Sequence, residues 1–136
     1  MSSQIRRLNP PSLPDVRKVG YSQISVAGPG ALAFVSGQVA WSAENSAVTG
    51  SLDEQTALVI KNLEYALVEL NCRAENIVNM RVYMTDLTPE TQAIVMPQLL
   101  SFLDGAQPSL TGIGVSALAA PELKIEIEMV VQRNAQ

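Results

Sequence analysis

The most constraining feature of the sequence is a strict alternation of apolar and charged side chains near its C-terminal end. The apolar positions are Leu123, Ile125, Ile127 and Met129, and the charged positions between them are Lys124, Glu126 and Glu128. Because successive side chains of a strand point to opposite faces of a sheet, this segment predicts a strand with one apolar and one charged face. Glu126 then faces either solvent or a second subunit, and the pattern alone leaves both open.

A second strand-like segment, residues 108–118, comes shortly before this one. It is rich in apolar and small residues, and a turn that contains Pro121 separates the two. Two such segments joined by a short turn are typical of an antiparallel hairpin. The sequence therefore predicts a hairpin over residues 108–132.

Two amphipathic helices are predicted in the middle of the chain. Ser51 and Glu54 have the spacing of a capping box, apolar residues then recur at intervals of three and four, and Asn71 ends the first helix. Thr88 followed by proline has the pattern of a second helix start, and this helix should end at Gly105. Pro97 should kink the second helix or shorten its first part.

Shorter strands complete the predicted fold. They cover residues 21–27, 31–36 and 77–84, and Gly28-Pro29-Gly30 is a turn signal between the first two, which we expect to form a pair. Residues 1–16 are expected to be an irregular or extended arm, and residues 42–50 a polar loop. The order strand pair, helix, strand, helix, strand pair predicts one α+β domain over residues 1–136, with two layers and both helices on one face of the sheet. The other face would stay exposed, which favours a homo-oligomer.

Composition narrows the chemistry. The chain has no histidine, which excludes catalytic triads that need histidine and zinc sites built on it. Cys72 is the only cysteine, so an intrachain disulfide is excluded, and we expect it to be a packed small residue. The net charge of −4 disfavours nucleic acid as a partner. No apolar run is long enough to cross a membrane and no signal peptide is recognisable, so a cytoplasmic location is predicted.

At this point the sequence resembles the RidA/YjgF family over about residues 20–132. The segments that carry the resemblance are Gly20-Tyr21-Ser22-Gln23, Ser36-Gly37-Gln38, Asp86-Leu87 and Lys124-Ile125-Glu126-Ile127-Glu128. The resemblance implies a chorismate-mutase-like α+β fold with a mixed sheet of about six strands. It also implies a homotrimer whose sheets form a central barrel, with small-molecule clefts between subunits. The activity implied is hydrolysis of reactive imines and enamines to keto acids and ammonia without a cofactor or metal.

The resemblance also assigns candidate roles to individual residues. Tyr21 and Ser36 match residues that line the cleft, and Glu126 matches the glutamate that positions the hydrolytic water. Leu110 stands where active deaminases of the family have an arginine that binds the substrate carboxylate, and Gly112 stands where many members have cysteine. Because leucine cannot bind a carboxylate, loss of that bidentate contact would cost roughly two to three orders of magnitude in binding or rate.

Three outcomes are compatible with this departure. The cleft can process a less acidic or larger imine or enamine, it can bind a metabolite without turnover, or another cation can replace the missing one. Arg81 is a candidate for that cation, although it can equally pair with Glu126 or Glu128 at a subunit contact. Gly37 and Thr111 complete the set of candidate substrate-binding residues. A regulatory or ligand-binding trimer is the alternative function, and RNA cleavage is the least favoured.

Overall fold

A computed structural model describes residues 4–44 and 50–134 and contains two long helices and six strands. The strands are β1 (Arg6–Leu8), β2 (Ile24–Val26), β3 (Leu32–Gln38), β4 (Ile77–Met84), β5 (Ser109–Gly114) and β6 (Ile125–Gln132). The helices are α1 (Leu52–Leu70) and α2 (Pro89–Leu103), with the 3-10 turns η1 (Arg17–Val19) and η2 (Ala74–Asn76). Residues 1–3 of the expected arm and 45–49 of the expected polar loop lie outside the described residues.

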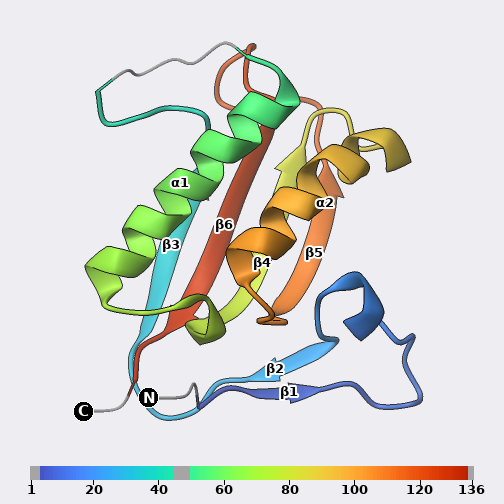
Figure 1. The fold of residues 1–136 in the computed structure, drawn as a ribbon, viewed down its shortest axis with the longest axis vertical. Helices are drawn as coiled ribbons and strands as arrows, with labels where there is room; N and C mark the ends of the chain where they lie inside the picture. Colours follow the sequence, from blue (N-terminus) through green and yellow to red (C-terminus); the bar gives the residue numbers. More distant parts are fainter. Residues whose placement is uncertain (1–3, 45–49, 135–136) are drawn as a thin grey trace.

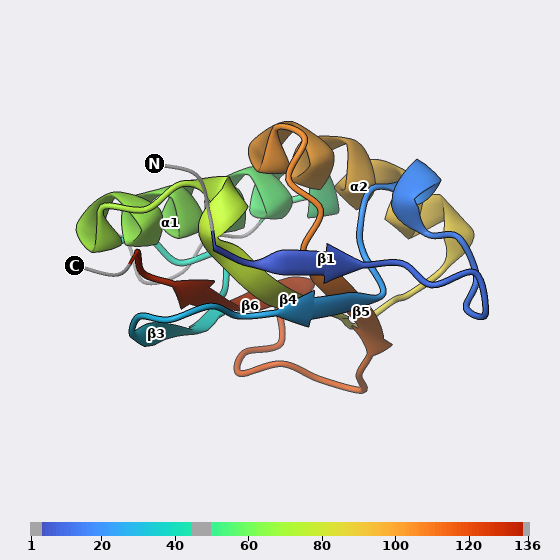
Figure 2. The same cartoon turned by 90° about the horizontal axis from the view of Figure 1, so that it is seen from below.

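The two helices lie side by side on one face of a four-stranded mixed sheet (Figure 1). The strand order is β3-β6-β4-β5, in which β4 pairs antiparallel with β6 and parallel with β5. Seen from below, no helix of the described residues covers the other face of this sheet (Figure 2). The α+β class, the two layers and the placement of both helices on one face are therefore confirmed.

The predicted C-terminal hairpin is wrong. Both strands exist, but β4 lies between β5 and β6, so they are not neighbours. β5 ends at Gly114, and the connection over residues 115–124 is long enough to cross β4 before β6 begins. A strand with a neighbour on each side can hydrogen-bond its backbone groups in both directions. Because β4 lies between β5 and β6, it has such neighbours, whereas a β5–β6 hairpin would place β4 elsewhere.

The predicted pairing of the first two strands is also wrong. β2 pairs antiparallel with β1, which forms within the segment expected to be irregular, and β3 pairs with β6 at one edge of the large sheet. The six strands therefore divide into a four-stranded and a two-stranded sheet. A parallel bridge between Ser22 and Ser109 links the segment before β2 to β5.

Both predicted helix starts are confirmed. Ser51 caps α1 in a capping box, with the Glu54 N–H donating to Ser51 Oγ at 3.2 Å, and Asn71 ends the helix in the left-handed region at φ 54°. Thr88 caps α2, which ends before Asp104 rather than at Gly105. Pro97 lies inside α2, yet the helix runs unbroken from Pro89 to Leu103, so the expected shortening is wrong.

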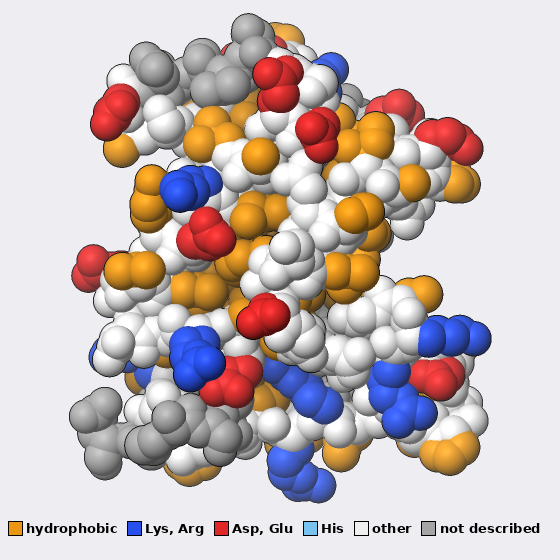
Figure 3. Space-filling model, viewed as in Figure 1, with side chains coloured by type: hydrophobic (Ala, Val, Ile, Leu, Met, Phe, Trp, Pro, Cys, Tyr) orange, Lys and Arg blue, Asp and Glu red, His pale blue; other side chains and the backbone are white. Residues whose placement is uncertain are grey.

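A single large core joins the helices to the sheet. Apolar side chains are visible between the two helices when the molecule is viewed from the helix side (Figure 3). The buried members come from both helices and the two central strands: Val59, Leu63, Leu67, Ile77, Met80, Val82, Met84, Val95, Leu99, Leu103, Ile125, Ile127, Met129 and Val131. Cys72 is half-buried and packs against this cluster, as expected. None of the helices in the described part of the chain has the length and apolar character to cross a membrane.

Arg7 fastens the small sheet to the large one. Its guanidinium donates to the carbonyl oxygens of Ile77 at 2.5 Å and Val78 at 3.1 Å, and to Ser25 Oγ at 2.6 Å. Burial lowers the pKa of Arg7 to about 10, so the side chain keeps its charge at neutral pH.

Replacing this guanidinium should loosen the N-terminal sheet. We expect Arg7→Ala to lower the free energy of unfolding by about 1–2 kcal/mol, because charged hydrogen bonds to carbonyls are lost while some desolvation cost is relieved. Urea denaturation measures the change. Arg6→Ala is the matched control, since Arg6 is exposed, and it should change stability by less than about 0.5 kcal/mol. Equal effects of the two variants would contradict the assignment.

Candidate functional site

The sheet separates the predicted site residues onto its two faces. Tyr21, Leu110 and Gly112 line a cavity on the helix side. Arg81 and Thr111 are paired in register and alternate with residues that face the helices, so they face the uncovered side. Glu126 alternates along β6 with the buried residues Ile125 and Ile127, and the exposed Ser36 follows Val35, which packs against the core, so both side chains also face the uncovered side. Gly37 lies beneath Glu126. One chain therefore does not bring the two groups together.

The cavity has a volume of about 490 Å³ and lies beside β5, the edge strand of the sheet. It is enclosed by β4, β5, α2 and the segment around η1. Most of its lining is apolar: Val19, Val82, Met84, Leu87, Val95, Met96, Leu100 and Leu110. The polar side chains that line it are Lys18, Tyr21 and Gln92. A concave, mostly apolar cavity with a few polar groups is the usual form of a small-molecule site.

One backbone hydrogen bond and one side-chain hydrogen bond hold the segment around η1 against the edge of the sheet. The Ser22 N–H donates to the Pro108 carbonyl at 3.1 Å, and Gln107 Nε2 donates to the Arg17 carbonyl at 3.0 Å. Gly20 adopts φ 106°, and a Cβ there would lie 2.3 Å from Leu100 Cδ2. Glycine at this position thus lets the chain turn in close contact with α2 and close one wall of the cavity.

Glu126 lies over Gly37 on the other face of the sheet. A Cβ at Gly37 would come within 2.0 Å of Glu126 Oε2, so only glycine leaves room for the carboxylate in this position. The pairing of β3 with β6 is irregular between Val35 and Gln38, which places Gly37 within a bulge. The structure therefore brings Glu126 into contact with Gly37, the residue that follows Ser36.

The strand that carries Glu126 is positioned by the buried side chain of Gln55 on α1. Gln55 Oε1 accepts from the Lys124 N–H at 2.8 Å, and Gln55 Nε2 donates to the Glu122 carbonyl at 2.8 Å. Because the amide satisfies both backbone groups immediately before β6, it fixes where that strand begins. No pattern in the sequence singled out Gln55.

Arg81 does not reach the cavity. Its strand neighbours Met80 and Val82 are buried under the helices, whereas Arg81 is exposed on the opposite face, in register with Glu128 and Thr111. Within residues 4–44 and 50–134 the one ion pair joins Arg17 to Asp15, so Arg81 pairs with neither Glu126 nor Glu128 in a single chain. The hypothesis that Arg81 replaces the missing cation is therefore not supported within one subunit.

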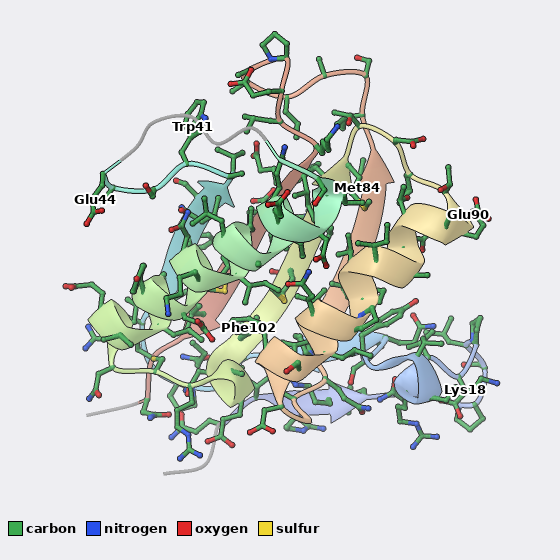
Figure 4. All side chains as sticks on the ribbon, turned by 45° about the horizontal axis from the view of Figure 1, so that its top comes forward. Lys18, Trp41, Glu44, Met84, Glu90 and Phe102 are labelled. Atoms are coloured by element: carbon green, nitrogen blue, oxygen red, sulfur yellow. The ribbon has the colours of Figure 1, made fainter. Side chains whose placement is uncertain are left out.

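Lys18 is the cation that sequence reasoning missed. It lies on η1, at the side of α2 away from α1 (Figure 4), and it lines the cavity together with Leu110. Nothing in the sequence marks it, because the cavity is assembled from segments that are far apart along the chain. In the described part of the chain, no group of three or more acidic or cysteine side chains has a metal-binding arrangement.

Tyr83 forms a further contact on the uncovered face. Its hydroxyl donates to Glu128 Oε1, and Tyr83 lies opposite Glu126 in the register of β4 and β6. The hydrogen bond to Glu128 is the main reason that the pKa of Tyr83 is raised above 10.0, and partial burial and the charge of Glu128 act in the same direction.

Comparison with known proteins identifies the class of α+β protein to which this fold belongs. The structure matches that of YyfB from Yersinia pestis, described as a protein of the conserved Rid family, with a TM-score of 0.86 and 32% identity over 94% of this chain and 98% of that one. The sequence model of the family described as Endoribonuclease L-PSP matches residues 15–133. The chain belongs to this family, also called the RidA/YjgF family.

Two fungal relatives support the same assignment. The mitochondrial protein mmf2 of Schizosaccharomyces pombe is 30% identical over 82% of this chain and 94% of its own length. The mitochondrial protein MMF1 of Saccharomyces cerevisiae is 29% identical over 72% of this chain. The matched region spans 64% of the length of MMF1.

The hydrogen bond between Tyr83 and Glu128 should make the stability of the protein depend on pH in the range where tyrosine ionises. The folded protein holds the phenol proton more tightly than the unfolded chain does, so the contact contributes fully to stability below pH 10 and is lost as the pH rises through the raised pKa. Absorbance titration should detect a tyrosine with a pKa above 10.0 that is missing in Tyr83→Phe. The control Tyr65→Phe should retain it, and persistence of this titration in Tyr83→Phe would contradict the assignment.

Proposed function

We propose that this protein is a homotrimer with a small-molecule cleft at each subunit boundary. The main support is that the two groups of candidate site residues lie towards opposite edges of one sheet. The cavity lined by Tyr21 and Leu110 lies beside β5, and Glu126 lies over Gly37 of β3. A head-to-tail contact that closes into a ring brings the β5 edge of one subunit next to the β3 edge of its neighbour. Each cleft would then combine Tyr21 and Leu110 of one subunit with Glu126 of the next.

The uncovered face of the sheet supports the same assembly. Phe34, on β3, is 75% exposed, although it lies in a strand next to the apolar residue Val130 of β6. Large apolar side chains that are exposed on an uncovered sheet face are typical of a surface that becomes buried when subunits associate. Three such faces around a common axis give the barrel implied by the family resemblance.

A charge on this face should disrupt the trimer. We expect Phe34→Glu to shift the molar mass in light scattering towards that of a single chain, because a carboxylate would have to be buried in the barrel. Val68→Glu is the matched control: Val68 is 78% exposed on α1, on the helix face, and its substitution should leave the mass unchanged. A wild-type protein that is monomeric would overturn the proposal.

The reaction that we propose for the cleft is hydrolysis of a reactive imine or enamine. Water adds to the imine carbon while Glu126 accepts a proton from it. The same carboxylate then returns the proton to the nitrogen, which gives a carbinolamine. It next takes the remaining hydroxyl proton and passes it to the amino group as the C–N bond breaks, so that a carbonyl compound and ammonia are released. An enamine would first become the imine by protonation at carbon. The side chains of Tyr21, Ser36 and Thr111 and the backbone at Gly112 would orient the substrate, and no metal or cofactor is required.

The substrate differs from the usual 2-imino acids in this proposal. Leu110 lines the cavity where an arginine would bind a carboxylate next to the imine carbon, and it offers an apolar contact instead. The cleft thus favours a larger or less acidic imine, or an enamine.

Replacing the carboxylate tests the reaction. We expect Glu126→Gln to slow hydrolysis of imines generated by an amino-acid oxidase by about a hundredfold or more, because the amide cannot accept the proton from water. The rate is followed as faster loss of the semicarbazone formed by the free imine. Glu69→Gln, on the exposed surface of α1, is the control and should retain the wild-type rate. If the wild-type protein accelerates the hydrolysis of no imine, the deaminase proposal fails.

A trimer that binds a metabolite without turnover is the second candidate. The observation that favours it is Leu110, since loss of the anchoring cation removes a contact that the family's active deaminases use. Thermal stabilisation by a small keto compound, without hydrolysis of the related imine, would distinguish it from the enzyme.

RNA cleavage is disfavoured despite the description of the family. The sequence carries a net charge of −4 and no histidine, whereas RNA binding normally requires a basic surface. Absence of salt-sensitive RNA binding is therefore expected. We also propose a cytoplasmic location, although the two fungal relatives are named as mitochondrial proteins.

A further inference from the structure

The side chains that line the cavity indicate the chemical class of its ligand more closely than membership of the family does. Its walls over β4, β5 and α2 are apolar except for Gln92, and Val82, Leu100 and Leu110 are among the side chains that form them. An apolar lining of this size favours a ligand with an extended hydrocarbon part, because burying that part removes apolar surface from water. A small polar molecule would leave most of the lining without a partner.

Among the described residues, one cationic side chain lines this cavity, and it comes from η1, beside the edge strand β5. Lys18 is exposed and takes part in none of the ion pairs or side-chain hydrogen bonds of the described chain. No carboxylate lines the cavity. The nearby Asp15 forms its ion pair with Arg17, with Nε 3.2 Å from Oδ1, and Lys18 acts on Asp15 only through its charge, as the last of the causes that lower the pKa of Asp15. The ammonium group of Lys18 therefore has no ion-pair partner among the described residues.

The backbone around Lys18 is well fixed. On one side, the Val19 N–H donates to the Val16 carbonyl at 3.1 Å, and Val16 itself is buried. On the other side, Gly20 packs on Leu100, and the Arg17 carbonyl accepts from Gln107. The long side chain can therefore move, but its point of attachment at the mouth of the cavity cannot shift freely.

We infer that Lys18 is the specificity-determining cation of this site and that the ligand is an amphiphilic monoanion. Its apolar part packs against Leu110 and Leu100, and its carboxylate is held at the mouth by Lys18. The anion is thus bound from η1 rather than from position 110 on β5. This inference rests on the proposed small-molecule cleft, but it does not require turnover.

Three simple probes separate the two parts of such a ligand. Hexanoate carries both parts, hexanamide has the apolar part without the charge, and acetate has the charge without the chain. Calorimetric titration of the full-length protein should give the highest affinity for hexanoate, with hexanamide about three- to tenfold weaker, as expected for a partly exposed ion pair. Acetate should show no measurable binding.

The variant Lys18→Gln identifies the source of the preference. It should reduce the affinity for hexanoate to that for hexanamide and leave hexanamide binding unchanged, which also shows that the cavity remains intact. Lys61→Gln is the matched control, because Lys61 lies on α1 over the ring of Tyr65, and it should keep the preference for hexanoate.

Two results would overturn the inference: a preference for hexanoate that persists in Lys18→Gln, or no binding of either six-carbon probe. The expected binding pattern together with no hydrolysis of any imine would leave the inference standing and refute only the proposed reaction.

Discussion

The structure depends on the alternation of side chains along the two central strands, β4 and β6. Every second residue enters the core beneath the helices, and the residues between them, including Arg81, Glu126 and Glu128, are forced to the other face. Since both helices lie on the same side, no helix of the described residues covers this second face. The apolar core and the uncovered face are thus two results of one constraint.

The order of strands determines where chemistry can occur. Because β4 and β6 occupy the centre, β3 and β5 become the edges, and each edge carries half of the candidate site. The cavity at the β5 edge has an apolar lining and one lysine, and the β3 edge has a carboxylate seated on a glycine. This arrangement explains why a site of this kind is incomplete in one chain and why assembly and function are linked in our proposal.

The sequence predicted the local elements well where a local rule applies. The capping box at Ser51, the helix cap at Thr88, the helix end at Asn71 and the strand over residues 77–84 all appear as expected. The close contact of Gly37 with Glu126 was not predicted, because the two residues lie on different strands. Pairing failed in both predicted strand pairs, because adjacency in sequence says little about hydrogen bonding once a strand can cross to another place in the sheet. Pro97 likewise did not shorten α2.

The sequence by itself determined which strand faces are apolar and where the helices begin, since those properties depend on residue type and on spacing within a few turns or strand positions. That Leu110 stands where the family's active deaminases have an arginine is what the family resemblance implies. Only the tertiary structure decided that Leu110 and Arg81 lie on opposite sides of the sheet and that Lys18 lines the cavity. The physical reason is that a cavity is defined by side chains from segments distant in the chain, and their meeting depends on strand order, which no local pattern encodes.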